Sequence, residues 1–211
     1  IYATEATTEL CNIMLKDSAH IQTFEAEWKN RKARRAGRPE ITPLYTVEDA
    51  AGVMELFVPM HYHEKFQVCD EISVRFVDAG HLLGSSSIEI WLTKEGEQKK
   101  MVFSGDIGQG NKPLIKAPEY IEEADYVLGE STYGDRVHEV PIDFAKALAD
   151  VMRQTFQAGG NLVIPAFSVG RTQEILYFIR RIKEEGMLSD IEDFEVYMDS
   201  PLAVEATAVF H

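Results

Sequence analysis

The chain of 211 residues can hold one large or two small domains, and its 45% hydrophobic and 27% charged residues are ordinary for a globular protein. No apolar run approaches the roughly 20 residues of a membrane helix, and the first residues lack a signal-peptide pattern, so we expect a cytoplasmic protein without a membrane partner. The net charge of −14 opposes long-range attraction of a polyanion, although a bound metal can reverse that locally.

The first part of the chain is predicted to be mostly helical after a short opening strand at residues 1–3. Thr4 can cap a helix that runs to about Ala19, because its hydroxyl can accept a hydrogen bond from a free N–H of the first turn. A second helix is predicted to carry Phe24 and Trp28 and to end near Gly37.

Basic residues concentrate on this second helix and its exit, at Lys29, Arg31, Lys32, Arg34, Arg35 and Arg38. Positive charge suits the C-terminal end of a helix dipole, so a solvated helix face is favoured over a track for phosphate groups. Further along, Thr46-Val47-Glu48-Asp49 has the pattern of a capping box for a short helix that ends near Leu56. The chain from there to Phe66 is predicted to be a loop.

Apolar and polar residues alternate in the next stretch, as in strands with one buried face. The alternation covers residues 72–76 and 88–92, and residues 101–103 form a third predicted strand. Glycine-flanked loops follow the first and the third of these strands, and they hold His81 and Asp106 respectively. Imidazole nitrogen and carboxylate oxygen are two ligand types that hydrolytic zinc sites combine, although capped turns would hold the same residues.

From residue 125 onward, short apolar strands are predicted to alternate with amphipathic helices. The predicted strands cover residues 126–129, 162–164 and 194–198. Helices are predicted from Pro141 to Gly159, from Gly170 to Glu185 and from Pro201 onward. This alternation is typical of a parallel sheet covered on both faces, in which ligands bind beyond the carboxyl ends of the strands.

Three polar clusters follow these strand ends, at Glu130-Ser131-Thr132, Ser168-Val169-Gly170-Arg171 and Asp199-Ser200. Ser168 and Ser200 lie at predicted helix N-termini, whose free N–H groups suit phosphate, or they simply cap those helices. Arg171 stands at the positive end of a helix dipole, so it needs an anion or a carboxylate partner. Pairing with Asp199 is favoured over phosphate, because the short turn before Arg171 would hold it close to the sheet.

Five motifs stand in register along the chain. They are Ala79-Gly80-His81-Leu82-Leu83-Gly84-Ser85, Ser104-Gly105-Asp106-Ile107-Gly108, Glu130-Ser131-Thr132-Tyr133-Gly134, Pro165-Ala166-Phe167-Ser168-Val169-Gly170-Arg171-Thr172-Gln173-Glu174 and Met198-Asp199-Ser200-Pro201-Leu202-Ala203. Together they resemble the successive signatures of the metallo-β-lactamase-fold, β-CASP family of RNA-processing nucleases. The match in order and spacing covers almost the whole chain.

The resemblance implies an α/β fold, with a partial αβ/βα metallo-β-lactamase sandwich over residues 1–140 joined to part of a parallel α/β β-CASP domain over residues 141–211. It implies a metal-dependent hydrolase, a ribonuclease that cleaves RNA phosphodiester bonds. Single-stranded RNA is the implied partner, because a duplex would not reach the metals in a narrow cleft. The resemblance also allows a homo-oligomer.

By the same resemblance, two zinc ions would share a hydroxide that attacks phosphorus. His81 and Asp106 are the implied metal ligands, with Asp106 bridging the two ions, and Glu130 is implied to orient a catalytic histidine. The implied substrate contacts are Ser131, Thr132, Ser168, Arg171 and Ser200.

The chain departs from the family pattern at both ends. The family's main zinc motif, His-x-His-x-Asp-His, would lie before Ile1, and two further histidine motifs would lie after His211. The segment His61-Tyr62-His63-Glu64-Lys65-Phe66 does not substitute, because Lys65 and Phe66 stand in place of the Asp and the last His. We therefore expect the complete protein to be the nuclease, and this stretch alone to be inactive and to bind zinc weakly or not at all.

Two other functions are compatible with the motifs. A hydrolase of a small thioester, lactam or phosphodiester would share the fold, but the helix start at Gly170-Arg171-Thr172 has no evident use there. A non-catalytic partner subunit of an RNA-processing complex would be expected to have lost metal ligands, whereas His81, Asp106 and Glu130 are all present.

Overall fold

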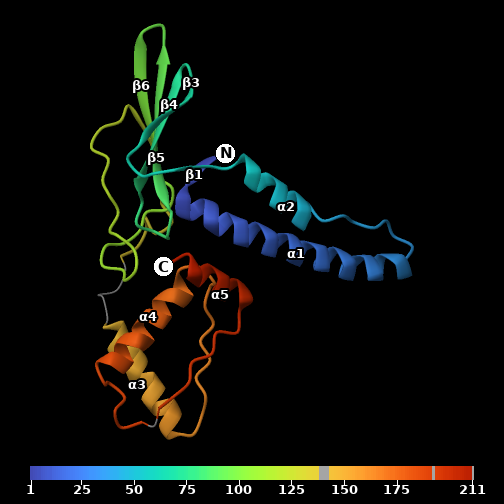
Figure 1. Cartoon of the computed structure of the whole chain (residues 1–211), viewed down its shortest axis with the longest axis vertical. Helices are drawn as coiled ribbons and strands as arrows, with labels where there is room; N and C mark the ends of the chain where they lie inside the picture. The colour runs from blue at the N-terminus through green and yellow to red at the C-terminus, as the bar shows by residue number, and fades with distance from the viewer. Residues whose placement is uncertain (138–142, 192, 211) are drawn as a thin grey trace.

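The chain forms a twisted sheet, a long projecting helix and a cluster of three helices near its C-terminus (Figure 1). The computed structural model describes residues 1–137, 143–191 and 193–210. The predicted helix start at Pro141 and the predicted domain boundary after residue 140 lie outside these described residues.

The main sheet has the strand order β3-β4-β5-β6-β7. Its strands are β3 Lys65–Cys69, β4 Ile72–Asp78, β5 Ser86–Lys94, β6 Glu97–Phe103 and β7 Tyr126–Leu128. The first four run antiparallel, while β7 pairs in parallel with β6 through Phe103 and Leu128. The strands predicted from alternation and the strand predicted at residue 126 are confirmed. Because β6 and β7 are parallel, the loops that follow them leave the sheet at the same edge.

The two faces of the sheet differ in polarity. On one face the ring of Phe66 lies between those of Tyr2 and Phe76, at centroid distances of 4.8 and 5.5 Å. On the other face the carboxylate of Glu89, which is 0% exposed, contacts the guanidinium of Arg75 and the Lys100 ammonium, the latter at 2.6 Å. Burial alone would raise the pKa of Glu89, but these two cations outweigh it and the pKa is lowered.

Helix α1 runs without a break over Glu5–Arg35. The sequence predicted two helices here, and that prediction is wrong. No glycine or proline interrupts the stretch, and Ala19, at the predicted break, is fully buried, so nothing stops the hydrogen-bond ladder. Thr4 caps the helix as predicted, with its Oγ1 accepting from the N–H of Thr7 at 3.3 Å. Neither α1 nor any other described helix is both long and apolar enough to span a bilayer.

The stretch between α1 and the main sheet is more regular than its sequence suggests. Thr46 caps α2, Val47–Val53, in the predicted capping box, and a 3₁₀ turn, Met54–Leu56, follows. The loop predicted up to Phe66 is wrong, because it contains β2, Val58–Met60, and the first residues of β3. Strand β2 pairs in parallel with β1, Tyr2–Thr4, a partner from far away in the chain that no local pattern reveals.

Three helices, α3 Phe144–Gln157, α4 Arg171–Glu184 and α5 Pro201–Ala208, make up the C-terminal part. A core joins α3, α4 and the turn after α4, and its buried members are Ala145, Ala149, Met152, Ile182 and Leu188. Gly159 and Gly186 close α3 and α4 with positive φ angles of 72° and 64°, as predicted.

The strands predicted at residues 162–164 and 194–198 are not formed, so that prediction is wrong. Both segments lie outside the sheets of the described residues, and Val163 and Tyr197 are 84% and 82% exposed. An apolar run becomes a parallel strand only where neighbouring strands accept its hydrogen bonds. Within residues 143–191 and 193–210 no such neighbour is present, although the chain as a whole mixes helices and sheets as expected of an α/β protein.

Candidate active site

The loop between β4 and β5 carries His81 and is shaped by Ser85. The Oγ of Ser85 accepts hydrogen bonds from the backbone N–H groups of His81 and Leu82, each at 3.1 Å. From outside the loop, the hydroxyl of Tyr62 donates to the carbonyl of Ser85 at 2.8 Å. Burial, followed by the Asp78 carboxylate, raises the pKa of Tyr62 to about 12, so this donor keeps its proton.

The start of α1 fixes the same loop from a second side. The hydroxyls of Thr4 and Thr7 both donate to the carbonyl of Gly84, at 2.7 and 2.9 Å. Gly84 has a φ of 81°, and a Cβ there would lie 2.7 Å from the backbone nitrogen of Thr7. Only glycine allows this close approach.

The loop after β6 carries Asp106 and packs directly against the His81 loop. The N–H of Gly108 donates to the carbonyl of Ala79 at 2.8 Å. A Cβ on Gly108 would lie 1.6 Å from the carbonyl oxygen of Gly80, so no other residue fits there. This backbone contact brings Nε2 of His81 to 3.9 Å from Oδ2 of Asp106.

The His81 and Asp106 side chains converge but do not form a hydrogen bond with each other. A separation of 3.9 Å is too long for a hydrogen bond, yet both donor atoms can face one cation. Lys112 adds a positive charge close by, since its Nζ lies 3.5 Å from the carbonyl of His81. The pair therefore offers one nitrogen and one carboxylate oxygen to a shared ligand.

Glu130 follows β7 and braces the Asp106 loop. Its Oε1 accepts from the N–H of Ile107 at 2.6 Å, and its own N–H donates to the Oγ of Ser104 at 3.0 Å. The hydroxyl of Thr132, followed by the N–H of Ile107, lowers the pKa of Glu130. Glu130 is thus an anion that holds the residue after Asp106 in place. Ser131 and Thr132 continue from it, and the carbonyl of Ser131 closes a turn.

Ser168 and Ser200 come together although they are far apart in the sequence. Their Oγ atoms are 3.2 Å apart, and Ser200 caps α5 by accepting from the N–H of Ala203 at 3.2 Å. Gln173 is buried behind them and donates to the carbonyl of Ser168 and to the hydroxyl of Thr207, both at 2.9 Å. The starts of α4 and α5 therefore form one polar surface.

Arg171 does not pair with Asp199, so the favoured prediction for this residue is wrong. Its Nη1 contacts Oε2 of Glu174 at 2.6 Å, one turn along α4, and its side chain is 58% exposed. The expected strand before the helix is absent, and Gly170, with a φ of 84°, turns the chain so that Arg171 faces outward. Arg171 is a surface cation at the start of α4.

One contact joins the two groups of candidate residues. A Cβ on Gly170 would lie 2.7 Å from Cδ2 of Leu82, so the His81 loop touches the start of α4. His81, Asp106 and Glu130 lie together where the loops after β4, β6 and β7 leave the sheet. Ser168, Ser200 and Arg171 lie beyond Leu82, at the neighbouring helix starts.

The histidines at residues 61 and 63 do not form a metal pair. His61 Nδ1 lies 3.3 Å from a Glu5 carboxylate oxygen and His63 Nε2 lies 3.4 Å from that of Glu119, so the two rings face different partners. Their side chains are 71% and 54% exposed, so both are surface residues. Across residues 1–137, 143–191 and 193–210, no group of three or more His, Cys, Asp or Glu side chains could hold a metal ion.

Three residues that shape the site were missed by sequence reasoning. Gly108 and Ser104 lie inside a quoted motif, and a glycine two residues after Asp106 could have indicated a close backbone approach. Nothing in the sequence around Tyr62, which lies between His61 and His63, indicates its hydrogen bond to the distant Ser85. Its contact with Ser85 depends on tertiary structure alone.

Comparisons with known proteins extend the match over the whole chain. An RNase J-like protein of Methanocaldococcus jannaschii is 32% identical over 213 residues, which cover 100% of this chain and 44% of the relative. A ribonuclease of Thermus thermophilus is 29% identical over 100% of this chain and 42% of its own length. Cleavage and polyadenylation specificity factor 73 of Drosophila melanogaster is 28% identical over 99% of this chain and 28% of its own length. The chain thus spans less than half the length of these curated relatives. No protein-family model matches it.

Proposed function

Because this chain belongs to the metallo-β-lactamase-fold, β-CASP family of RNA-processing nucleases, we propose that the complete protein hydrolyses RNA phosphodiester bonds with bound zinc. One observation carries the proposal: Nε2 of His81 and Oδ2 of Asp106 lie 3.9 Å apart at the open edge of the sheet. Nitrogen and carboxylate oxygen are the donors that hydrolytic zinc sites combine. Relatives named as ribonucleases support the reaction class.

His81 and Asp106 fit part of a metal site. The donor types suit zinc, and both side chains are accessible, but the described residues supply only these two ligands at this place. We assign the remaining ligands to the rest of the complete protein. When bound, the metal would polarise the phosphoryl oxygen and supply a nucleophile from water at neutral pH.

The chain's own residues hold and orient the reacting groups. His81 would hold the metal through Nε2, and Asp106 would hold it through a carboxylate oxygen. Glu130, kept anionic by its lowered pKa, anchors the Asp106 loop through the N–H of Ile107. Glu130 therefore acts indirectly, by positioning the loop that carries Asp106.

Phosphate groups of the substrate would contact the polar residues around this edge, namely Ser131, Thr132, Ser168, Arg171 and Ser200. The paired hydroxyls of Ser168 and Ser200 lie beside the helix starts, whose N–H groups favour an anion. Arg171 is exposed enough to add a charge-assisted contact. We propose a single strand as substrate, because an unpaired strand can bring one phosphate to the place where His81 and Asp106 converge, whereas a duplex would not reach it.

Substitution of the two carboxylates in the full-length protein tests this function. Asp106→Ala should lower cleavage of a labelled single-stranded RNA more than tenfold, because it removes a ligand from an exposed position. Glu130→Gln should lower it by about 10- to 100-fold by loosening the Asp106 loop. The matched control Asp70→Ala, an exposed acid in the turn before β4, should change nothing.

Zinc content provides a second measurement. After treatment with a chelator and dialysis against zinc, wild type should regain zinc and activity, and Asp106→Ala should regain less zinc. Residual cleavage above a tenth of wild type in Asp106→Ala would contradict the proposal. So would wild-type protein that hydrolyses a small thioester, lactam or phosphodiester but leaves RNA intact.

A further inference from the structure

A helical arm projects from the molecule, well away from the candidate active site. It consists of residues 20–46, which are the C-terminal half of α1 and the segment that returns along it (Figure 1). The return segment is held by Asn30, whose side chain exchanges two hydrogen bonds of 2.8 Å with the backbone of Ile41. Ala26 is buried on the same side of the helix. The opposite side of α1 is therefore left open.

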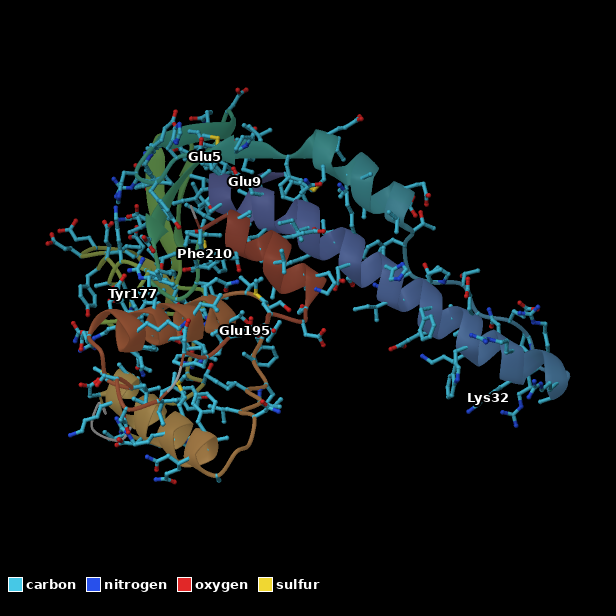
Figure 2. All side chains as sticks on the ribbon, turned by 60° about the horizontal axis from the view of Figure 1, so that its bottom comes forward. Glu5, Glu9, Lys32, Tyr177, Glu195 and Phe210 are labelled. Atoms are coloured by element: carbon cyan, nitrogen blue, oxygen red, sulfur yellow. The ribbon has the colours of Figure 1, made fainter. Side chains whose placement is uncertain are left out.

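The open side carries aromatic and basic side chains together. With about 100° of rotation per residue, Phe24, Trp28, Arg31, Lys32 and Arg35 fall on one face, roughly opposite Ala26 and Asn30. Phe24 and Trp28 are 61% and 48% exposed, and Nζ of Lys32 lies 3.7 Å from the centre of the Trp28 ring. Figure 2 shows Lys32 near the far end of α1, remote from Tyr177 and Glu195 of the C-terminal part.

The arm reverses the charge of the chain around it. Residues 29–38 hold six basic and no acidic side chains, although the chain has a net charge of −14. Lys29 pairs with Glu25 and Arg34 with Glu40. Arg31 and Arg35 form no ion pair with any described residue. Apart from the favourable interaction of Arg35 with the helix dipole, their charges are therefore free for a partner.

We propose that this face of the arm is a second RNA-binding site, separate from the site of cleavage. Arg31, Lys32 and Arg35 would contact phosphates, and Trp28 would stack on an exposed base. The sequence favoured a solvated helix face here, but the structure adds the two exposed aromatic rings and the projection of the arm. The choice of RNA rests on the proposed function, whereas the site itself does not.

The positive charge of the face favours a polyanion over a second copy of the chain. In a symmetric dimer the same patch meets itself, which would set Arg31 and Arg35 against cations of the partner. The distance from the active site sets a length requirement. Thr7 lies beside the His81 loop and Trp28 is 21 residues further along α1, or roughly 30 Å at about 1.5 Å per residue. Only a long RNA would reach both sites.

Salt-dependent RNA binding tests the arm. In the full-length protein with Asp106→Ala, kept in a chelator so that residual cleavage stops, the triple change Arg31→Gln, Lys32→Gln and Arg35→Gln should weaken binding of a 30-nucleotide oligouridylate. Fluorescence anisotropy over a salt series should show the slope of log K against log salt falling by about two, as expected for three lost phosphate contacts on a single strand. Glutamine keeps the helix propensity of the replaced residues, so α1 should remain folded, which circular dichroism checks.

Matched variants separate this site from general electrostatics. Lys94→Gln, Lys99→Gln and Arg180→Gln remove the same charge from exposed positions outside the arm and should leave the slope unchanged. Trp28→Ala should weaken binding about 5- to 100-fold with an unaltered slope, because stacking carries no charge.

Three outcomes would overturn the proposal. One is an equal loss of slope in the triple variant and its control, which would mean that only net charge matters. Another is tight binding that survives both the triple change and Trp28→Ala. The third is an unchanged affinity for RNA accompanied by a shift from dimer to monomer in sedimentation, which would make the face a protein interface. Binding is measured without cleavage, so failure of the proposed function, seen as absence of RNA cleavage by wild type, is distinguished from all three.

Discussion

The two parts of the chain, residues 1–137 and 143–210, are stabilised in different ways. In the first part, five strands exchange backbone hydrogen bonds in register and two of their loops touch through Gly108 and Gly80. In the second part, helices pack on a small apolar core, while the apolar segments at residues 162–164 and 194–198 have no strand neighbour among the residues that the structure describes. The spacing of apolar residues is therefore enough to predict which face of a helix is buried. An apolar segment forms a strand only where a neighbouring strand can accept its hydrogen bonds.

The largest expected effect tests the tight packing of the first part. Gly108→Ala should lower the free energy of unfolding by about 3 kcal/mol or more, because its Cβ would overlap the carbonyl oxygen of Gly80. Thermal unfolding of the full-length protein measures this loss. Gly110→Ala is the matched control, since a Cβ there meets no atom within 4 Å. Equal melting temperatures for the two variants would show that the His81 and Asp106 loops are not in contact.

A somewhat smaller effect is expected from the buried ion cluster on the polar face of the sheet. Glu89→Gln should cost about 3 kcal/mol at pH 7, the low end for a broken buried pair, because Arg75 and Lys100 are partly exposed and can be hydrated. The exposed Glu97→Gln should cost almost nothing.

The pH dependence of this loss follows from the lowered pKa of Glu89. The folded carboxyl ionises at lower pH than the unfolded one, so its stabilisation is complete above the unfolded pKa of about 4.3 and is lost as the pH falls through the folded pKa. The free energies of unfolding of wild type and Glu89→Gln, measured by urea titration, should therefore begin to converge as the pH falls below the unfolded pKa and should meet below the folded pKa. A difference that stays constant from pH 7 to pH 3 would mean that packing, not charge, is responsible.

The smallest expected effect lies in the second part, at Arg171. Arg171→Ala should change the free energy of unfolding by less than about 1 kcal/mol, because the Arg171 side chain in its ion pair with Glu174 is 58% exposed. Arg153→Ala should lower the free energy of unfolding by more, because Arg153 donates hydrogen bonds both to Asp190 and to the carbonyl of Met187. A rise in KM for RNA with an unaltered melting temperature would support a phosphate contact. A decrease of several kcal/mol in the free energy of unfolding would show instead that Arg171 has a structural role.

Sequence reasoning succeeded where local chemistry decides the outcome. The alternation at residues 72–76 and the capping pattern at Thr46 each depend on neighbours in the chain, and both were predicted. It failed at β2, whose partner is β1, and at Arg171, whose direction depends on the turn at Gly170. In the site, the motifs indicated His81, Asp106 and Glu130, but not that Glu130 bonds the backbone of Ile107. Such contacts are set by tertiary packing.

The unbroken length of α1 has a mechanical consequence. Its first turn is bonded to Gly84 in the His81 loop, and its last turn lies at the tip of the arm, so one stiff rod of about 46 Å connects them. The arm cannot swing relative to the sheet unless α1 bends or the bonds of Thr4 and Thr7 to Gly84 break. A force on the tip of the arm is therefore transmitted along α1 as a torque on the loop that carries His81.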